Sequence, residues 1–187
     1  MKSLYLIGGG GHCKSCIDVI ESQREYKILG IFDVQDKVGQ EVLGHKIIDS
    51  DVNISKYTQP GNHFLITVGQ IKSPQLRIKL YEMNLNLATI ISSRAYVSEH
   101  SSIGRGTIVM HDALINAGAV IGENCIINSK ALIEHDAIVG DHCHISTGAI
   151  INGDCKIGEK TFIGSNTVVK NRTTIPPSSI ISYGEKV

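Results

Sequence analysis

The sequence lacks an excess of either charge and any long apolar run near its start. Its 187 residues carry 18 Lys and Arg against 18 Asp and Glu, and no local basic cluster compensates for the absent net charge. A general attraction to nucleic acid is therefore excluded, because that attraction depends on positive charge. The first apolar stretch, Leu4 to Ile7, is much shorter than a signal-peptide core or the roughly 20 residues of a membrane-spanning helix. We expect a cytoplasmic protein with no membrane partner.

Aromatic residues and cysteines are also few. Aromatic side chains make up 5% of the chain, whereas hydrophobic residues reach 42% and charged residues 19%. This composition is typical of a globular protein with one large or two small domains. The five cysteines are an odd number in a chain long enough to form its own core. A disulfide framework is therefore not expected, and the thiols are predicted to be free.

An apolar β-branched residue returns at every sixth position of the second half of the chain, from Val97 to Ile181. A small residue lies four positions after nearly all of them, as Ala113 and Cys125 illustrate. A period of six fits neither an α-helix nor simple alternation, but it fits a coil of three short strands, each with one inward Ile or Val. Such coils would stack at roughly 4.8 Å. Glycines are predicted to supply the corner backbone at Gly104, Gly122, Gly140, Gly158 and Gly164.

The first ninety residues have a different pattern, in which strands alternate with helices. Strands are predicted at 4–7, 28–32 and 64–68, a glycine turn at 8–12, and helices at 15–25 and 74–83. This alternation predicts a parallel sheet of the doubly wound kind. We therefore expect two domains, with residues 1–90 forming a Rossmann-like α/β domain and residues 91–187 forming the repeat.

A run of glycines joins the first predicted strand to the first helix. Gly10, Gly11 and His12 lie where backbone N–H groups at a helix start can bind an anion, normally a phosphate. Asp33 follows about twenty residues later and is placed to accept hydrogen bonds from hydroxyls or a base edge. Cys13 replaces the third glycine of a dinucleotide fingerprint, and the domain is short for a dinucleotide. A mononucleotide or a nucleotide sugar fits better than NAD, and a tight turn without a ligand is the alternative.

The two halves together resemble one family. The run GGGGH after the first strand, the segment VGQ at Val68–Gln70, and IEHD at Ile133–Asp136 within the repeat are similar to the sugar acyltransferases of the PglD and NeuD type. The resemblance covers nearly the whole chain and implies a left-handed parallel β-helix assembled as a homotrimer. It also implies transfer of acetyl from acetyl-CoA to the 4-amino group of a UDP-linked 4-amino-4,6-dideoxy sugar. Family members commonly have His-Pro at the domain junction, where this chain has Ser92-Ser93-Arg94.

The resemblance also assigns roles to individual residues. His135 is the candidate general base, because imidazole can take a proton as an amine attacks a thioester, and Asp136 is its acidic partner. His144 would donate a hydrogen bond to acetyl-CoA, and the backbone N–H of Gly153 would face the thioester oxygen. Gly164 and Ser165 would line the groove for CoA, and Asn128 would contact the sugar. The predicted UDP contacts are Gly10, Gly11, His12, Asp33, Gly69 and Gln70. Without the resemblance, an ordinary surface histidine is the simpler interpretation of His135.

A metal site is a competing interpretation of the histidines and cysteines around His142. Cys143 shares the small-residue register with Cys125, so both should point into the prism, whereas His135 and His142 should point outward. An inward thiol and outward imidazoles cannot hold one ion, and we expect no metal.

Two functions compete with N-acetylation of a nucleotide sugar. The first is O-acetylation of sialic acid, as in the NeuD branch of the family that this chain resembles. The second is a scaffold or sensor that binds a nucleotide sugar without catalysis. Thiol release from acetyl-CoA in the presence of each class of acceptor separates the three possibilities.

Overall fold

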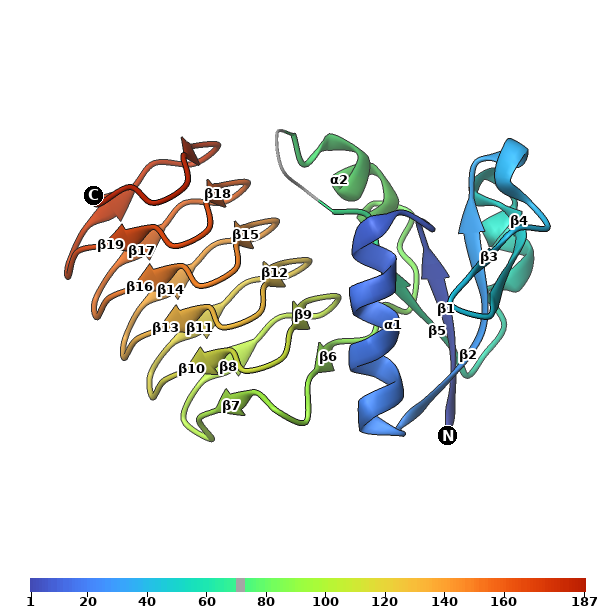
Figure 1. Cartoon of the computed structure of the whole chain (residues 1–187), viewed down its shortest axis with the longest axis horizontal. Coiled ribbons are helices and arrows are strands. Elements are labelled where there is room, and N and C mark those ends of the chain that lie inside the picture. The colour runs from blue at the N-terminus through green and yellow to red at the C-terminus, as the bar shows by residue number, and fades with distance from the viewer. Residues whose placement is uncertain (70–72) are drawn as a thin grey trace.

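In the computed structural model, which describes residues 1–69 and 73–187, an α/β domain lies beside a column of stacked coils (Figure 1). The sheet of the α/β domain has the strand order β3-β4-β2-β1-β5. Its strands are β1 (Lys2–Ile7), β2 (Tyr26–Asp33), β3 (Glu41–Val42), β4 (His45–Ser50) and β5 (Asn62–Ile66). Neighbouring strands are parallel except β3 and β4, which are antiparallel. The predicted parallel sheet is therefore present, with an antiparallel edge strand that the sequence pattern did not indicate.

Two helices complete this domain, α1 (Gly11–Gln23) and α2 (Gln75–Tyr81). The prediction that the first helix begins at Ser15 is wrong. Gly10 has an extended backbone and its carbonyl already accepts the N–H of Cys13, so the helix starts inside the glycine run. Arg24 ends α1 in a left-handed conformation (φ 57°). Short 3₁₀ turns at Gln35–Lys37 and Asp51–Tyr57 flank β3 and β4. Within the described ranges, no helix is long and apolar enough to cross a membrane.

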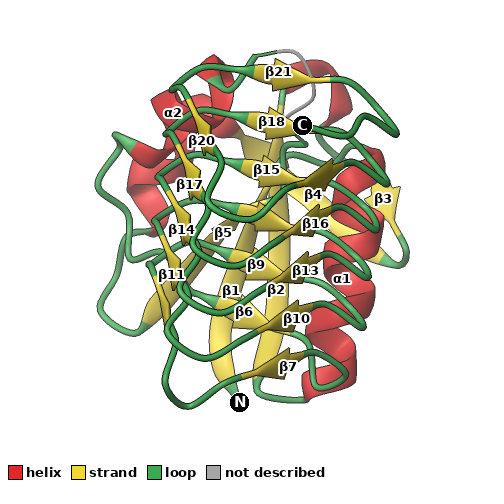
Figure 2. Ribbon diagram, turned by 90° about the vertical axis from the view of Figure 1, so that its left-hand side faces the viewer, coloured by secondary structure: helices red, strands yellow, loops and turns green. Residues whose placement is uncertain are grey.

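The column is a left-handed β-helix with three flat faces, each a parallel sheet (Figure 2). The first face contains β7 (Tyr96–Val97), β10 (Leu114–Ile115), β13 (Leu132–Ile133), β16 (Ile150–Ile151) and β19 (Val168–Val169). The second face contains β8 (Ser102–Ile103), β11 (Val120–Ile121), β14 (Ile138–Val139), β17 (Lys156–Ile157) and β20 (Thr174–Ile175). The third face contains β6 (Ile90–Ile91), β9 (Ile108–Val109), β12 (Ile126–Ile127), β15 (His144–Ile145), β18 (Phe162–Ile163) and β21 (Ile180–Ile181).

Each two-residue strand directs its second residue into the column and its first residue outward. Ile133, for example, lies between Ile115 and Ile151 of the neighbouring coils, and all three are fully buried. The small-residue register is also buried. Cys125 and Cys143 lie inside the column, where their thiols donate to the carbonyls of Gly140 (3.2 Å) and Gly158 (3.1 Å). The five cysteines are free, as the sequence predicted, and all five are buried.

The residues that turn the corners of the coils with a left-handed backbone are not the five glycines predicted from the sequence. The residues with a left-handed backbone are mostly Asp, Asn, Lys, Arg and His, and they recur every sixth position through Asp112, Asp136 and Asp154, with glycine at Gly118 and Gly148. Asp and Asn are the non-glycine residues that tolerate this conformation best. The five glycines predicted to form corners do not have positive φ. They are required because a Cβ would collide with the next coil, as at Gly140, where it would lie 2.7 Å from Glu159 N.

The third face of the β-helix packs against the α/β domain. Ile90, Ile108 and Ile126 on its outer side are fully buried in one cluster with Ile17 and Ile20 of α1. A polar chain crosses the same junction: Ser92 Oγ lies 2.6 Å from His111 Nδ1, and His111 Nε2 lies 3.0 Å from Asp18 Oδ2 on α1. The hydroxyl of Ser92 therefore holds the His111 ring that contacts Asp18 of the α/β domain.

A short segment covers one edge of the β-helix. Residues 185–187 run beside β19, and the main chain of Val168 exchanges hydrogen bonds with Glu185 (2.8 Å) and Val187 (3.0 Å). The N–H of Lys170 also donates to the carbonyl of Val187. The last strand of the first face therefore has its main-chain groups satisfied by a neighbouring segment.

The close spacing of the coils gives a stability prediction. Gly140→Ala should lower the free energy of unfolding by about 1–3 kcal/mol, because the added methyl group overpacks a backbone contact. Gly11→Ala is the control, since nothing lies within 4 Å of its added Cβ. Urea unfolding monitored by circular dichroism measures both variants. If both substitutions changed the free energy of unfolding equally, the close spacing of the coils would not be the reason for glycine at position 140.

Candidate functional site

His135 lies at the corner between the first and second faces, separated from β13 by Glu134. Its Nδ1 is 2.9 Å from Oδ2 of Asp136, and both side chains are more than half exposed. Asp136 reaches back to its neighbour because it is the left-handed residue of the corner (φ 60°), anchored by its N–H on the carbonyl of Ala117. With Nδ1–H donating to Asp136, Nε2 carries the free lone pair. The sequence-predicted pair is thus in hydrogen-bond contact.

The glycine one coil above His135 leaves room for its ring. A Cβ at Gly153 would lie 2.7 Å from Nε2 and 2.8 Å from Cε1 of His135. Any larger residue would displace the imidazole or block the edge that carries the lone pair. Gly153 therefore lies beside the basic nitrogen of His135, as the register of eighteen residues predicted.

The surroundings of His135 favour its protonated form. The hydrogen bond to Asp136 raises the pKa of His135, and the negative charges of Asp136, Asp154 and Glu134 raise it further against an opposing effect of desolvation. Glu134 does not compete with Asp136 for a hydrogen bond to the imidazole. Its carboxylate instead accepts from Asn116 Nδ2 (2.8 Å) and from the main-chain N–H of His135 (3.3 Å). The corner thus provides a histidine that is more basic than usual.

A cavity of about 260 Å³ lies between the third face and the α/β domain. Its lining residues are His12, Gly69, Asn128, His144, Ser146, Phe162, Ser165 and Tyr183. His144 is 5% exposed, and its Nε2 lies 3.2 Å from Asn128 Nδ2. Ser146 Oγ is 2.9 Å from Ser165 Oγ. Five residues predicted from the sequence therefore meet in one cavity, although they had been assigned to different ligands.

Three further lining residues, Ser146, Phe162 and Tyr183, were missed by the sequence analysis. Phe162 occupies an outward position of the third face, and Ser146 follows β15 at its corner. The ring of Phe162 packs edge-on against that of His144, with the ring centroids 5.2 Å apart. The period of six locates these positions, but it does not reveal which outward face meets the α/β domain. The signal that could have found two of them is the spacing of one coil, which separates Phe162 from His144 and Tyr183 from Ser165.

His12 is the second histidine of the cavity and has an environment opposite to that of His135. Burial lowers the pKa of His12 to about 3, with further contributions from the positive charge of Arg77 and from His144. Its Nε2 is buried and has no hydrogen-bond partner among the described residues. His12 packs beside Gly69, since a Cβ added at Gly69 would lie 3.3 Å from the Cβ of His12. His12 is therefore neutral at physiological pH and has a ring nitrogen available to a ligand.

The remaining residues of the glycine turn do not line this cavity. Gly10 and Gly11 are exposed, and an added Cβ at either would meet nothing within 4 Å. Asp33 accepts hydrogen bonds from Gly9 N–H (2.7 Å), Val34 N–H (2.7 Å) and Lys37 (3.0 Å). Burial opposes ionisation of Asp33, but these three bonds outweigh it and lower its pKa. Much of its predicted hydrogen-bonding capacity is thus used within the turn, and Gln70 lies outside the described residues.

One chain does not bring His135 to the cavity. The corner that holds His135 and Gly153 joins the first and second faces, so it lies opposite the third face, which forms the wall of the cavity. Gly164 and Ser165 follow β18 at the corner between the third and first faces. Gly164 is buried, and a Cβ there would lie 2.6 Å from the backbone of Ser182. The predicted catalytic and CoA-binding residues therefore fall into two groups on different corners.

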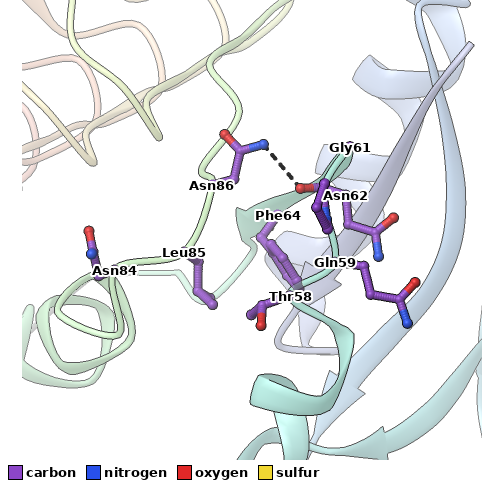
Figure 3. Close-up of a pocket in the computed structure, with 9 residues that line it drawn as sticks. Thr58, Gln59, Gly61, Asn62, Phe64, Asn84, Leu85 and Asn86 are labelled. Carbon is purple, nitrogen blue, oxygen red and sulfur yellow. Dashed lines mark hydrogen bonds between the residues drawn. The ribbon is translucent and has the colours of Figure 1, made fainter.

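A separate cavity of about 270 Å³ lies at the amino-terminal end of β5 (Figure 3). It is lined by Thr58, Gln59, Pro60, Gly61, Asn62, Phe64, Asn84, Leu85 and Asn86. Asn86 Nδ2 donates to the carbonyl of Asn62 (3.1 Å) across its rim. None of these lining residues titrates near neutral pH, so this cavity offers no group for acid–base chemistry.

Comparison with protein families assigns both parts of the chain. Residues 3–83 match the family model described as the PglD N-terminal domain. Residues 100–135 and 136–171 match the model described as bacterial transferase hexapeptide (six repeats). Among curated proteins, the uncharacterized protein L142 of Acanthamoeba polyphaga mimivirus is 38% identical over 106 residues, which is 55% of this chain. The chain spans only about a fifth of the length of that relative (20%).

Solved structures resemble the whole chain. The acetyltransferase domain of PglB from Neisseria gonorrhoeae FA1090 has a TM-score of 0.90 and 26% identity, with coverage of 100% of this chain and 91% of that chain. The same domain in complex with acetyl coenzyme A has a TM-score of 0.89 and 25% identity, with coverage of 100% of this chain and 92% of that chain. A third similar structure is a mutant of perosamine N-acetyltransferase from Caulobacter crescentus in complex with CoA and GDP-perosamine. It has a TM-score of 0.90 and 28% identity, with coverage of 100% of this chain and 89% of that chain.

The hydrogen bond at the exposed corner gives a prediction about the pKa of His135. Asp136→Asn should lower this pKa, because it removes the anion that stabilises the imidazolium, while asparagine keeps the left-handed corner. An NMR titration of the imidazole measures the change. Glu134→Gln is the control and should lower the pKa less, because Glu134 acts on the ring through its charge alone. An unchanged pKa in Asp136→Asn would show that Asp136 is only a corner residue.

Proposed function

Because the chain belongs to the hexapeptide-repeat acetyltransferases of the PglD and NeuD type, we propose that it transfers acetyl from acetyl-CoA to an amino group of a nucleotide-linked sugar. The observation that carries this proposal is the His135–Asp136 pair, with the basic nitrogen of His135 beside Gly153. The similar structures support it, since they are an acetyltransferase domain in complex with acetyl coenzyme A and a perosamine N-acetyltransferase in complex with CoA and GDP-perosamine.

The chemistry assigns one task to each group at the exposed corner. The amine nitrogen of the sugar attacks the thioester carbon of acetyl-CoA, and Nε2 of His135 takes the proton that the amine loses. The backbone N–H of Gly153 stabilises the oxygen on which negative charge develops. The C–S bond then breaks, CoA leaves as the thiolate, and the amide product forms. Asp136 keeps the imidazole oriented and stabilises its protonated state.

The α/β domain holds the nucleotide in this proposal. The N–H groups of Gly10 and Gly11 begin α1, where the helix dipole favours a diphosphate. His12 extends from the same turn into the cavity and lies with Gly69 opposite His144. We propose UDP as the nucleotide and a 4-amino-4,6-dideoxy sugar as the acceptor, with Asp33 and Gln70 as further contacts. GDP is the second candidate, because the perosamine N-acetyltransferase structure contains GDP-perosamine.

A homotrimer accounts for the separation of the two groups of site residues. His135 and Gly153 of one chain would meet His144, Asn128 and Ser165 of the next chain, because the two groups lie on different corners of the β-helix. The groove between two prisms would then hold acetyl-CoA and exclude water from the reacting atoms. Neither corner alone encloses a molecule as long as CoA.

Removal of the proposed base tests the reaction directly. His135→Ala should lower kcat by roughly 10²-fold or more, since general-base catalysis contributes about 10² to 10⁴. The assay follows thiol release from acetyl-CoA with UDP- and GDP-linked amino sugars and with sialic acids as acceptors. His100→Ala is the matched control, because His100 is also an exposed residue next to a corner. Wild-type binding of the nucleotide sugar without thiol release would instead favour a scaffold, and transfer to a sialic acid hydroxyl would favour the NeuD alternative.

Mixing two defective chains tests the shared site. His135→Ala removes the base, and Ser165→Trp fills the cavity, so each variant alone should be inactive. If each site combines His135 of one chain with the cavity of the next, randomly mixed 1:1 trimers should recover about one quarter of wild-type activity. Sedimentation confirms that the mixed species are trimers. No recovery in mixed trimers, or full activity in a monomer, would contradict the shared site.

A further inference from the structure

Arg77 of α2 is fully buried at the place where the α/β domain meets the β-helix. It is 1% exposed, and all four hydrogen bonds of its guanidinium go to main-chain carbonyls. Nη1 donates to Ile66 (2.6 Å) and Val68 (3.2 Å). Nε donates to Asn124 (3.1 Å), and Nη2 to Gly106 (3.4 Å). Two acceptors thus belong to the end of β5 and two belong to corners of the β-helix, so one side chain joins the two parts.

The charge of Arg77 is not neutralised by an acidic partner. No ion pair to Arg77 occurs among residues 1–69 and 73–187. Burial lowers the pKa of Arg77 to about 10, which still leaves it protonated at neutral pH. A buried cation is costly unless its N–H groups are hydrogen-bonded, and four of the five N–H groups of Arg77 donate to carbonyls. These four acceptors surround the guanidinium only when both parts of the chain are in place, so any shift between the parts would leave the buried charge less well solvated.

Arg77 donates to carbonyls in the two segments that lead to opposite walls of the cavity lined by His12 and His144. Val68 is followed directly by Gly69, which packs on His12. Asn124 precedes β12, which pairs with β15 so that Ile126 lies beside His144. The side chain of Asn124 also contacts α2 and the adjacent coil, because its Nδ2 lies 3.4 Å from the carbonyl of Arg77 and 3.0 Å from His142 Nδ1. Arg77 is therefore hydrogen-bonded both to the segment that leads to Gly69 and to the coil that pairs with the strand of His144.

We propose that Arg77 is a positioning residue for acetyl transfer, which fixes the end of β5 against two corners of the β-helix so that the nucleotide sugar and acetyl-CoA meet at reacting distance. This inference rests on the proposed function. Arg77 does not touch either substrate in this arrangement. It acts through the cavity walls, and a displacement of about 1 Å between reacting groups is enough to lower a rate about 10²-fold.

The experiment compares Arg77→Lys and Arg77→Met with the control Arg105→Met. Arg105 lies at the same junction, where it contacts Tyr81 of α2 and Glu123 of the β-helix, but it is about half exposed. Lysine keeps the positive charge and loses the fork that reaches four carbonyls. We expect kcat of Arg77→Lys to fall about 10- to 100-fold while KM for each substrate changes less than about threefold, because each substrate keeps its own binding surface. Arg105→Met should stay within about twofold of wild type.

Two further readouts separate positioning from simple loss of stability. In Arg77→Met the pKa of His12 should rise, whereas in Arg77→Lys it should not, since the charge of Arg77 contributes to lowering it. Hydrogen exchange should become at least about tenfold faster for residues 66–69 and 122–126 in both Arg77 variants. Amides of β16 and β17 should be unaffected. If neither Arg77 variant folds, Asn124→Gly keeps the left-handed corner, removes the contact with α2, and should lower kcat with the same unchanged KM values.

The results that overturn the inference are distinct from those that overturn the function. If Arg77→Lys kept kcat within about twofold, or if both KM values rose in step with lost stability, Arg77 would not be a positioning residue. If the wild-type chain released no CoA with any acceptor, the acetyltransferase proposal would fail. Hydrogen exchange would still report on Arg77 in that case, and unchanged exchange at residues 66–69 and 122–126 would refute the docking role as well.

Discussion

The coil spacing of the β-helix is the constraint on which the rest of the structure depends. Parallel pairing places each residue directly over the residue eighteen positions earlier, as Ile151 lies over Ile133. Every corner must therefore fit between the corners of the adjacent coils. Glycine is found where the next backbone comes closest, and Asp or Asn recurs where the chain turns left-handed. The same stacking places Gly153 against His135, so the geometry of the candidate site follows directly from the packing rule that builds the fold.

The environments of two histidines show how the fold assigns different tasks to one residue type. Asp136 and nearby carboxylates make His135 more basic than a free histidine. Burial and the charge of Arg77 hold His12 neutral. Under the proposed function, His135 is the imidazole suited to accept a proton, whereas the neutral His12 is suited to exchange hydrogen bonds with a ligand.

The sequence predicted the features that depend on local periodicity and failed where distant segments meet. The period of six revealed the coils, the inward Ile and Val residues, the buried thiols of Cys125 and Cys143, and the stacking of Gly153 on His135. The start of α1 was misplaced because four consecutive glycines conceal a helix boundary that only the backbone angles of Gly10 define. The role of Arg77 was invisible, since its four acceptors are main-chain carbonyls from separate parts of the chain and leave no side-chain pattern. The cavity residues Ser146 and Phe162 were missed because the period of six does not reveal which outward face of the β-helix meets the α/β domain.

The pairing of residues 185–187 with β19 has a consequence for the behaviour of the protein in a crowded solution. A column of parallel strands is open at each end, and exposed main-chain groups at such an end can template the addition of another chain. On the first face the last strand is already matched by Glu185 and Val187. Near β20, the adjacent Pro176 and Pro177 lack the N–H group that a further strand would need. At this end of the column, two of the three faces therefore offer fewer free main-chain groups to a further strand than an uncovered coil would.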